Sequence, residues 1–325
     1  MGLKIKIFQL VDLIILWLFY LSKALTFVVH PWVIKKVFDS LGYAFYYGRP
    51  KMRRDLHRKI ADAMPEMKDP NELKRIALGA CTAMVRPIYE GLLFWRHTDK
   101  FMRELEIENL EVFDKAMAEG KGILPYTMHL PSTIMLVHAI MARLNRSYSI
   151  IAWNPEDLPV KRYTRKMAEF GLMIGSDPEL PVIYAGPGRD AIRQLRERLS
   201  EGGGVGFAVD IPGKCVVPLF GRPAAVADGI AYLAWEFDAP IIPTVMIPEE
   251  GFKRRIIFFE PIRCEKTGDR KADVKRTMEK VIAAGERQVR MIPDQWMCWF
   301  GLWRWWEKAK EIEASAEGEE SSSAE

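Results

Sequence analysis

The stretch VGFAVDIPGKCVVPLFGRPAAVADGIAYLAWEFDAPIIPTVMI, residues 205–247, contains the clearest alternation of secondary structure in the chain. The apolar run at 205–210 is typical of a buried strand, and residues 228–239 have the composition of an apolar helix. A second apolar strand follows at 240–247. Strand, helix and strand in this order are typical of a parallel sheet covered by helices. The stretch therefore predicts an α/β fold.

The same alternation continues outward from this stretch. Helices are predicted for most of 50–97, and strands and helices then alternate to the end of a helix at 273–291. The predicted strands cover 120–128, 147–153 and 254–262, and the predicted helices cover 131–145, 159–171 and 188–203. We expect a mostly parallel central sheet flanked by helices, with ligands bound at the carboxyl ends of the strands.

Composition excludes several classes of protein. The chain has 325 residues, of which 49% are hydrophobic, so it can bury a sizeable core. Its four cysteines, Cys81, Cys215, Cys264 and Cys298, are scattered without a CxxC pair. This spacing predicts neither a metal site nor a disulfide framework. The glycines at 202–204 close a helix and enter a strand, which is the reverse of a phosphate-binding loop.

Charge is distributed unevenly along the chain. Six of the 43 acidic residues follow position 310, where no basic residue occurs, so residues 1–310 carry 47 basic against 37 acidic side chains, or +10. A basic body suits anionic partners. The basic stretch KMRRDLHRK, 51–59, lacks a recognised nucleic-acid motif, so no nucleic-acid partner is expected. The acidic low-complexity tail, 307–325, is expected to be disordered.

The first 36 residues are the most apolar part of the chain and are predicted to form a membrane-associated helix. On one continuous helix, Asp12, Lys23 and His30 fall within about 20° of one another and form a single polar stripe. Such a helix can lie in the membrane surface or span it with the stripe against protein; a buried core helix is the alternative. The lysines that flank it favour an anionic cytoplasmic leaflet: Lys4, Lys6, Lys35 and Lys36.

An aromatic cluster, predicted to belong to a helical C-terminal cap, closes the folded region. It contains Trp296, Trp299, Phe300, Trp303, Trp305 and Trp306. This density suits a membrane interface or an acyl-binding surface. A tightly packed cap explains it equally well.

Two polar residues end apolar strands and form a candidate site. His129 follows GILPYTM, and Asp210 ends VGFAVD. Each alone is explained by a turn or by a satisfied core position. Because the carboxyl ends of parallel strands share one edge of the sheet, the two together indicate a binding or catalytic site.

A turn at Phe220, Gly221 and Arg222 follows the second of these strands. Small residues then precede the helix, and Asp228 stands near its start, where a carboxylate complements the helix dipole. Small side chains at a helix entrance allow a long ligand to approach the backbone. A plain connecting loop is the alternative.

The order of these pieces resembles the bacterial lipid A biosynthesis (late) acyltransferase family, within the wider lysophospholipid acyltransferases. The resemblance rests on the apolar N-terminus, GILPYTMH, the block FAVDIPGKCVVPLFGRPAAVADGIAYLAWEFDAPIIPT and RQVRMIPDQWMCWFGLWRW. It implies an acyltransferase α/β domain over 37–306 at the cytoplasmic face of the bacterial inner membrane. It also implies transfer of a fatty acyl chain from an acyl carrier protein or coenzyme A thioester to a membrane lipid, with no metal or redox cofactor.

In the family pattern, the histidine is the general base and a carboxylate follows it five positions later. Here that position is Ile134, and no Asp or Glu occurs from 121 to 154; a family arginine also corresponds to Asn154. Asp210 is therefore a candidate catalytic partner for His129. Alternatively, His129 acts unaided, or the chain retains only a lipid-binding or scaffolding role.

Basic side chains that hold acidic parts of the substrates are also predicted. Arg189 resembles a basic position before the family's third helix, and Arg222 with Phe220 and Gly221 belongs to the predicted substrate-binding turn. Lys161, Arg162 and Arg165 are further candidates, with a solvated helix face as the alternative.

Overall fold

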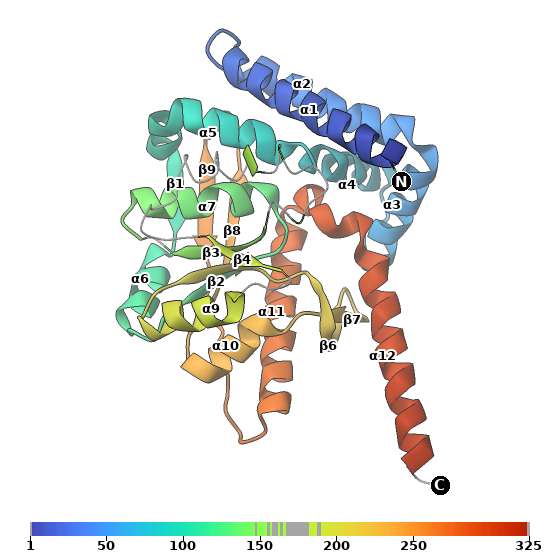
Figure 1. Cartoon of the computed structure of the whole chain (residues 1–325), viewed down its shortest axis with the longest axis vertical. Helices are drawn as coiled ribbons and strands as arrows, with labels where there is room; N and C mark the ends of the chain where they lie inside the picture. Colours follow the sequence, from blue (N-terminus) through green and yellow to red (C-terminus); the bar gives the residue numbers. More distant parts are fainter. Residues whose placement is uncertain are drawn as a thin grey trace.

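A computed structural model of the chain describes residues 2–146, 148–154, 157, 162, 165, 166, 182–186 and 190–323. Its centre is a seven-stranded sheet in the order β1-β9-β8-β2-β5-β3-β4 (Figure 1). The strands of this sheet are β1 Leu105–Glu108, β2 Leu124–Thr127, β3 Ser149–Trp153, β4 Ile183–Ala185, β5 Val205–Ala208, β8 Ile241–Pro248 and β9 Arg254–Phe258. Only the β8–β9 pair is antiparallel among these neighbours, so the predicted mostly parallel sheet is confirmed.

Helices cover both faces of the sheet (Figure 1). The helices before the sheet are α1 Gly2–Leu25, α2 Pro31–Gly48, α3 Pro50–Ala63, α4 Pro70–Ala83 and α5 Arg86–Arg103. Those that follow or alternate with strands are α6 Leu110–Ala118, α7 Pro131–Arg143, α9 Ala191–Ser200, α10 Gly229–Phe237, α11 Arg270–Met291 and α12 Leu302–Ser323. Between α11 and α12 lie the short 3-10 helices η2 Pro293–Gln295 and η3 Met297–Phe300.

Successive residues of the central strands enter two different cores. Leu124 and Ile241 belong to the core beneath α9, α10 and α11, whereas their neighbours Ile123 and Ile242 pack in the core that contains α5 and α7 residues. Side chains alternate across a strand, so a strand covered on both faces must be apolar at nearly every position. This requirement explains why β2 and β8 read as continuous apolar runs.

A separate antiparallel hairpin precedes α10. It consists of β6 Pro212–Leu219 and β7 Arg222–Val226, and it contacts α11 and α12. Phe220 and Gly221 form its turn with φ values of 51° and 71°, in the left-handed region that two-residue hairpin turns require. The predicted turn is confirmed, and the small residues after it form β7.

The N-terminal region differs from the prediction of one membrane-associated helix. The chain leaves α1 at Leu25 and begins α2 at Pro31, where the His30 ring accepts the Trp32 N–H as an N-cap. His30 therefore does not continue a stripe with Asp12 and Lys23. In the part of the chain described, none of the helices is by itself long and apolar enough to cross a bilayer, although α4 and α5 together, with a 62° bend between them, meet that test.

Three further regions can be compared with what the sequence predicts. The tail from 307, expected to be disordered, is helical up to Ser323 as the continuation of α12. Its Ala and Glu content favours a helix once the packed start of α12 has nucleated one. The short β1 and α6 were not anticipated, because the strand LEIE alternates charged and apolar residues over only four positions. Most of the helix expected at 159–171 lies outside the described residues.

Candidate active site

The register of β2 and β5 brings His129 and Asp210 together. The strands are parallel, and Thr127 lies opposite Ala208, so the residues two positions beyond each strand meet at the carboxyl edge of the sheet. The backbone N–H of His129 lies 2.9 Å from each oxygen of the Asp210 carboxylate. The imidazole Nδ1 lies 2.7 Å from Asp210 Oδ1. One carboxylate therefore fixes both the backbone and the ring of this histidine.

The carboxylate of Asp210 is buried, and it accepts hydrogen bonds from His129 and Trp296. Its side chain is 0% exposed, and besides His129 it accepts the indole N–H of Trp296 at 2.6 Å. Burial by itself raises the pKa of this carboxyl, but the attraction of the His129 ring and the hydrogen bonds from His129 and Trp296 outweigh it and lower the pKa below its usual value. The carboxylate is therefore held in its ionised form.

The His129 ring is poised to exchange a proton at its other nitrogen. An ionised carboxylate can only accept, so in the neutral ring Nδ1 carries the hydrogen and Nε2 carries the lone pair. Burial disfavours the charged ring, yet the charge and hydrogen bond of Asp210 prevail and raise the pKa of His129 above its ordinary value of 6.5. The side chain is 31% exposed and lines a cavity.

This cavity has a volume of about 560 Å³ and a predominantly apolar wall. Its size lies within the range of roughly 300–1,000 Å³ that is usual for small-molecule sites. The apolar side chains that line it come from α9, α10, β3, and β5 with the residue after it, and they include Ile151, Leu195, Phe207, Val209, Ile230 and Leu233. Its polar wall residues include His129, Asp228 and Tyr232. A long apolar chain fits such a wall, and His129 provides a reactive group beside it.

Cys298 completes a group of possible metal ligands. The ligand atoms of His129, Asp210 and Cys298 lie within 4.8 Å of one another, the one such cluster found among the described residues. Burial raises the pKa of the Cys298 thiol well above 9.0, and the negative charge of Asp210 adds to this. A metal ligand has to be a thiolate. In the described structure these side chains are joined by hydrogen bonds, with Asp210 Oδ1 accepting from His129 Nδ1 at 2.7 Å.

Ile134 does not face the same space as His129. It lines a second, smaller cavity of about 130 Å³ between α7 and the sheet, together with Thr127 and His138. No carboxylate lines this second cavity in the described structure. The carboxylate that contacts the histidine ring thus comes from β5, and not from the first turn of α7.

The predicted turn residues stand away from the reactive pair. The Phe220 ring packs against the rings of Trp296 and Trp299, with centroids 5.5 Å away in each case. The Arg222 guanidinium lies over the ring of Trp306 at 4.5 Å. Neither these residues nor Gly221 lines the large cavity. Of these residues, Phe220 contacts Trp296, the tryptophan that donates to Asp210.

The remaining predicted cations give little support to a binding role. Arg189 and Lys161 lie outside the described residues. Arg162 and Arg165 are exposed, and the backbone N–H of Arg162 donates to Asp12 at 3.0 Å. Arg196, which sequence reasoning did not single out, lines the cavity and pairs with Glu236 at 3.0 Å.

The aromatic cluster is mainly a packed cap. Trp296, Trp299, Trp305 and Trp306 are all buried. Sequence reasoning recognised the cluster but did not predict that Trp296 donates a hydrogen bond to Asp210. A tryptophan at a predicted core position could have suggested such a contact, because a buried indole N–H needs a hydrogen-bond acceptor.

Comparison with known proteins identifies a family. A family model described as bacterial lipid A biosynthesis acyltransferase matches residues 4–305, nearly the whole chain. No curated protein matches the chain.

Proposed function

Because the chain belongs to the bacterial lipid A biosynthesis acyltransferase family, we propose that it transfers a fatty acyl chain from an acyl thioester to a hydroxyl of a lipid or glycolipid. The observation that carries this proposal is the His129–Asp210 pair beside the apolar cavity. The donor is a thioester of acyl carrier protein or coenzyme A. The reaction takes place at the cytoplasmic face of the bacterial inner membrane, where the lipid acceptor is found.

His129 is the general base in this proposal. Its Nε2 removes the proton of the acceptor hydroxyl as that oxygen attacks the thioester carbonyl carbon. The new carbon–oxygen bond forms a tetrahedral intermediate, which collapses as the carbon–sulfur bond breaks. The imidazolium then returns the proton to the leaving thiolate, so the products are an ester and a free thiol.

Asp210 has two tasks in the same reaction. It keeps the hydrogen on Nδ1, so that Nε2 presents a lone pair, and its charge stabilises the imidazolium that forms during attack. Trp296 holds the carboxylate from the opposite side. This assignment replaces the carboxylate that the family pattern places at position 134.

The cavity supplies the apolar half of the site. Burying each methylene of an acyl chain contributes about 0.8 kcal/mol, so an apolar wall of this extent favours a long chain. The chemistry proposed for His129 and Asp210 needs no metal or redox cofactor. Dialysis against EDTA should accordingly leave the rate unchanged, whereas a loss that Zn²⁺ restores would favour a metal held by His129, Asp210 and Cys298.

An assay of the purified full chain tests the proposal. Acyl carrier protein and coenzyme A thioesters are offered separately with a lipid A precursor, a glycolipid and a lysophospholipid, and the ester and released thiol are measured. We expect turnover that is lost in His129→Ala. The matched control is His57→Ala, which removes a half-buried histidine on α3 that bonds Tyr46 and lies outside the cavity.

A lipid-binding role without catalysis is the second candidate, and Ile134 is the observation that favours it. This candidate predicts that wild type and His129→Ala bind lipid equally and that neither forms ester with any donor. Equal turnover by wild type and His129→Ala would instead show that another group is the base.

A further inference from the structure

The central sheet divides near its carboxyl edge. Strands β3 and β5 pair with each other only at Ser149 and Ile150 of β3. Beyond these residues β3 stays in register with β4 up to Trp153, and β5 stays in register with β2 up to Ala208. Each strand keeps one neighbour and loses the other, so the sheet forks between β3 and β5.

The fork lies between the two cavities. Helices α9 and α10 border the first cavity, which contains His129, and α7 borders the second cavity on the opposite face of the sheet (Figure 1). A side chain on an intact sheet faces one side only. Four residues nevertheless line both cavities, and they directly follow the last β3–β5 pair: Ile151, Ala152, Phe207 and Ala208. These four, which we call the fork residues, mark a passage from one face of the sheet to the other.

The exposure of the fork residues supports such a passage. All four are only half-buried, although β5 lies inside the sheet between β2 and β3. On the neighbouring β2, residues Leu124 to Thr127 are buried throughout. Two of the fork residues are alanines, so little side chain fills the space between the strands. An unbranched hydrocarbon chain is the thinnest group that the proposed substrates bring to this gap.

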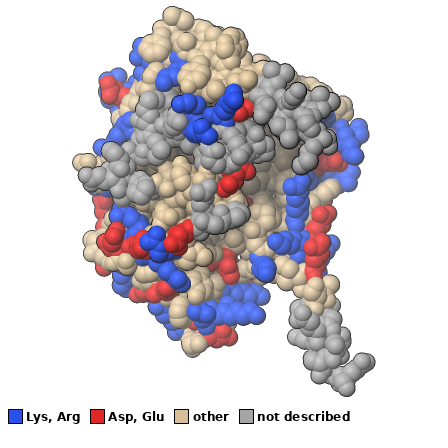
Figure 2. Space-filling model, in the orientation of Figure 1, with Lys and Arg blue, Asp and Glu red and all other residues tan. Residues whose placement is uncertain are grey.

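The second cavity is uncharged. Charged side chains are spread over the face of the molecule that Figure 2 shows, but none lines this cavity in the part of the chain that the structure describes. Burial lowers the pKa of His138 to about 4, so its ring is neutral. The Thr133 hydroxyl accepts the Met246 N–H at 2.9 Å. Because burying an unpaired charge is costly, this wall suits an uncharged chain end and disfavours a carboxylate or a phosphate.

Ile134 belongs to the wall of the second cavity, together with Val137 about one turn further along α7. The family pattern places a carboxylate at position 134, where it would face this uncharged wall without a cation. Isoleucine and valine instead present stiff, branched apolar side chains to the cavity. The residue at position 134 therefore decides what the second cavity can hold.

The volume of the second cavity limits how much of a chain can enter it. A water molecule occupies about 30 Å³, and a methylene group is of similar size. The cavity of about 130 Å³ thus has room for about four methylenes. Each methylene that moves from water into an apolar site tightens binding about fourfold. Filling this cavity therefore separates long chains from shorter ones.

We propose that the fork joins the two cavities into one site. The far end of the acyl chain passes between β3 and β5 into the second cavity, where Ile134 determines the longest chain that is accepted. This inference rests on the proposed function for the identity of the chain. It gives Ile134 a role in specificity and leaves proton transfer to His129 and Asp210.

Binding of saturated fatty acids tests the passage without any turnover. Isothermal titration calorimetry measures Kd for a series that lengthens by two carbons at a time, kept below the concentration at which micelles form. In the wild type we expect each methylene to tighten binding about fourfold until both cavities are filled. Ile134→Trp fills the second cavity and should end this gain about four methylenes earlier, whereas Ile134→Ala enlarges it and should extend the gain by about three. The same length limit in all three proteins would overturn the proposal.

Two further variants separate a blocked passage from general damage. Ala152→Leu narrows the fork from β3, away from α7, and should shorten the limit as Ile134→Trp does. Ile134→Leu keeps the side-chain volume and should keep the wild-type limit. A wild-type limit in Ala152→Leu would show that the cavities are separate and would also overturn the proposal. The extension expected for Ile134→Ala cannot arise from loss of stability.

Turnover distinguishes this inference from the proposed function. If the wild type forms ester, the chain length with the highest kcat/KM should fall in Ile134→Trp and rise in Ile134→Ala. Turnover with an unshifted preference would contradict the inference and leave the acyl-transfer proposal standing. Shifted binding limits without turnover by the wild type would support the inference and contradict the acyl-transfer proposal.

Discussion

Asp210 and Asp273 are two buried carboxylates with similar surroundings and different consequences. Both side chains are 0% exposed. Both accept a tryptophan indole N–H, from Trp296 at 2.6 Å and from Trp235 at 3.3 Å. Each also accepts a backbone N–H, from His129 and Thr267 respectively. By burial and donor type alone, the two sites are hardly distinguishable.

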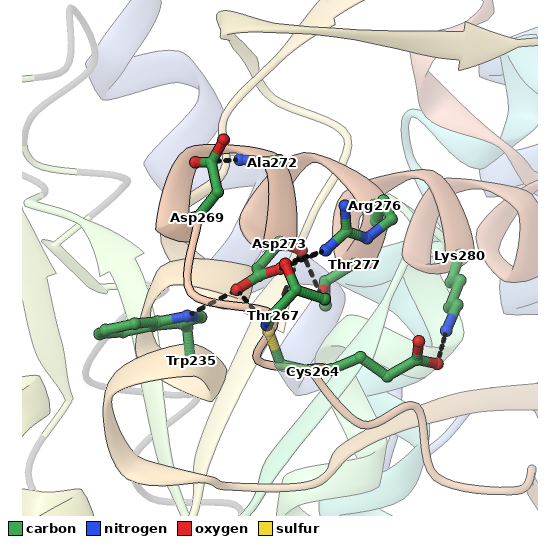
Figure 3. A network of polar contacts seen from close by, with 10 residues as sticks. Trp235, Cys264, Thr267, Asp269, Ala272, Asp273, Arg276, Thr277 and Lys280 are labelled. Carbon is green, nitrogen blue, oxygen red and sulfur yellow. Dashed lines mark hydrogen bonds and ion pairs between the residues drawn. The ribbon is translucent and has the colours of Figure 1, made fainter.

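The difference lies in where each network ends. Asp273 binds the Thr267 hydroxyl at 2.7 Å and Arg276 one helical turn away, and these contacts fasten the loop before α11 to the start of that helix (Figure 3). Asp210 instead holds, through Nδ1, the ring of a histidine that lines the cavity. A buried carboxylate therefore indicates chemistry only when its network reaches a group that can exchange a proton with a ligand.

The most direct test of the difference between Asp210 and Asp273 is to remove the negative charge at each site. Asp210→Asn should lower kcat by about 10⁴-fold, because the amide can no longer select the Nδ1–H tautomer or stabilise the imidazolium. Asp273→Asn should retain wild-type kcat and lower Tm, because it weakens the loop–helix contacts only. Steady-state kinetics and thermal unfolding on both variants provide the measurement. A kcat loss of similar size in Asp273→Asn would show that both substitutions act through loss of stability and that Asp210 has no particular role in the reaction.

A second test removes the tryptophan donors. Trp296→Phe should reduce kcat about tenfold, since the Asp210 carboxylate loses one charge-assisted hydrogen bond of about 1.5–3 kcal/mol and becomes less firmly placed. Trp299→Phe is the matched control, because its indole N–H donates to the carbonyl of Pro293 at 2.8 Å and not to a carboxylate. Equal kcat losses in the two variants would assign the effect to core packing.

The pH dependence of kcat/KM follows from the raised pKa of His129. A general base works when it is deprotonated, so activity should rise with pH through a midpoint above 6.5. Asp210→Asn removes the charge that raises this pKa, and the midpoint of its residual activity should move to lower pH. In Asp273→Asn the midpoint should stay at the wild-type value. A wild-type midpoint below 6.5 would contradict the assigned pairing.

The smallest effect is expected from restoring a carboxylate at the family position. Ile134 lines the second cavity and His129 the first, so Ile134→Glu places its charge in a different space. We expect no recovery of activity when Ile134→Glu is combined with Asp210→Asn. Recovery to within about tenfold of wild type would show that α7 can supply the partner after all.

Sequence reasoning reached the sheet and the reactive pair because both depend on local patterns. Apolar runs mark β2 and β5, and polar residues that end such runs must meet where parallel strands share an edge. The contact of Trp296 with Asp210 could not be predicted this way, since Trp296 lies between two 3-10 helices and not at the end of a strand. The break between α1 and α2 was missed because the sequence stays apolar through it, so that periodicity changes little until Pro31.

Sequence reasoning also could not assign the direction in which Ile134 points. Ile134, on α7, lines one cavity, and His129, beyond the end of β2, lines another; this depends on how α7 packs on the sheet, which spacing along the chain does not determine. Sequence reasoning named Asp210 as one candidate partner of His129, and the tertiary geometry shows the contact between them.

The residues of the candidate site lie far apart along the chain, and they are therefore synthesised at different times. The donors to Asp210 lie 81 residues before it and 86 residues after it, and the central strand β2 pairs with β8 in addition to β5. Long-range pairing of this kind forms slowly, after the intervening chain has been synthesised. A nascent chain that ends before Trp296 thus carries His129 and Asp210 without the group that encloses the carboxylate. The arrangement of His129, Asp210 and Trp296 becomes complete only when nearly the whole folded region has been made, so an unfinished chain does not contain it.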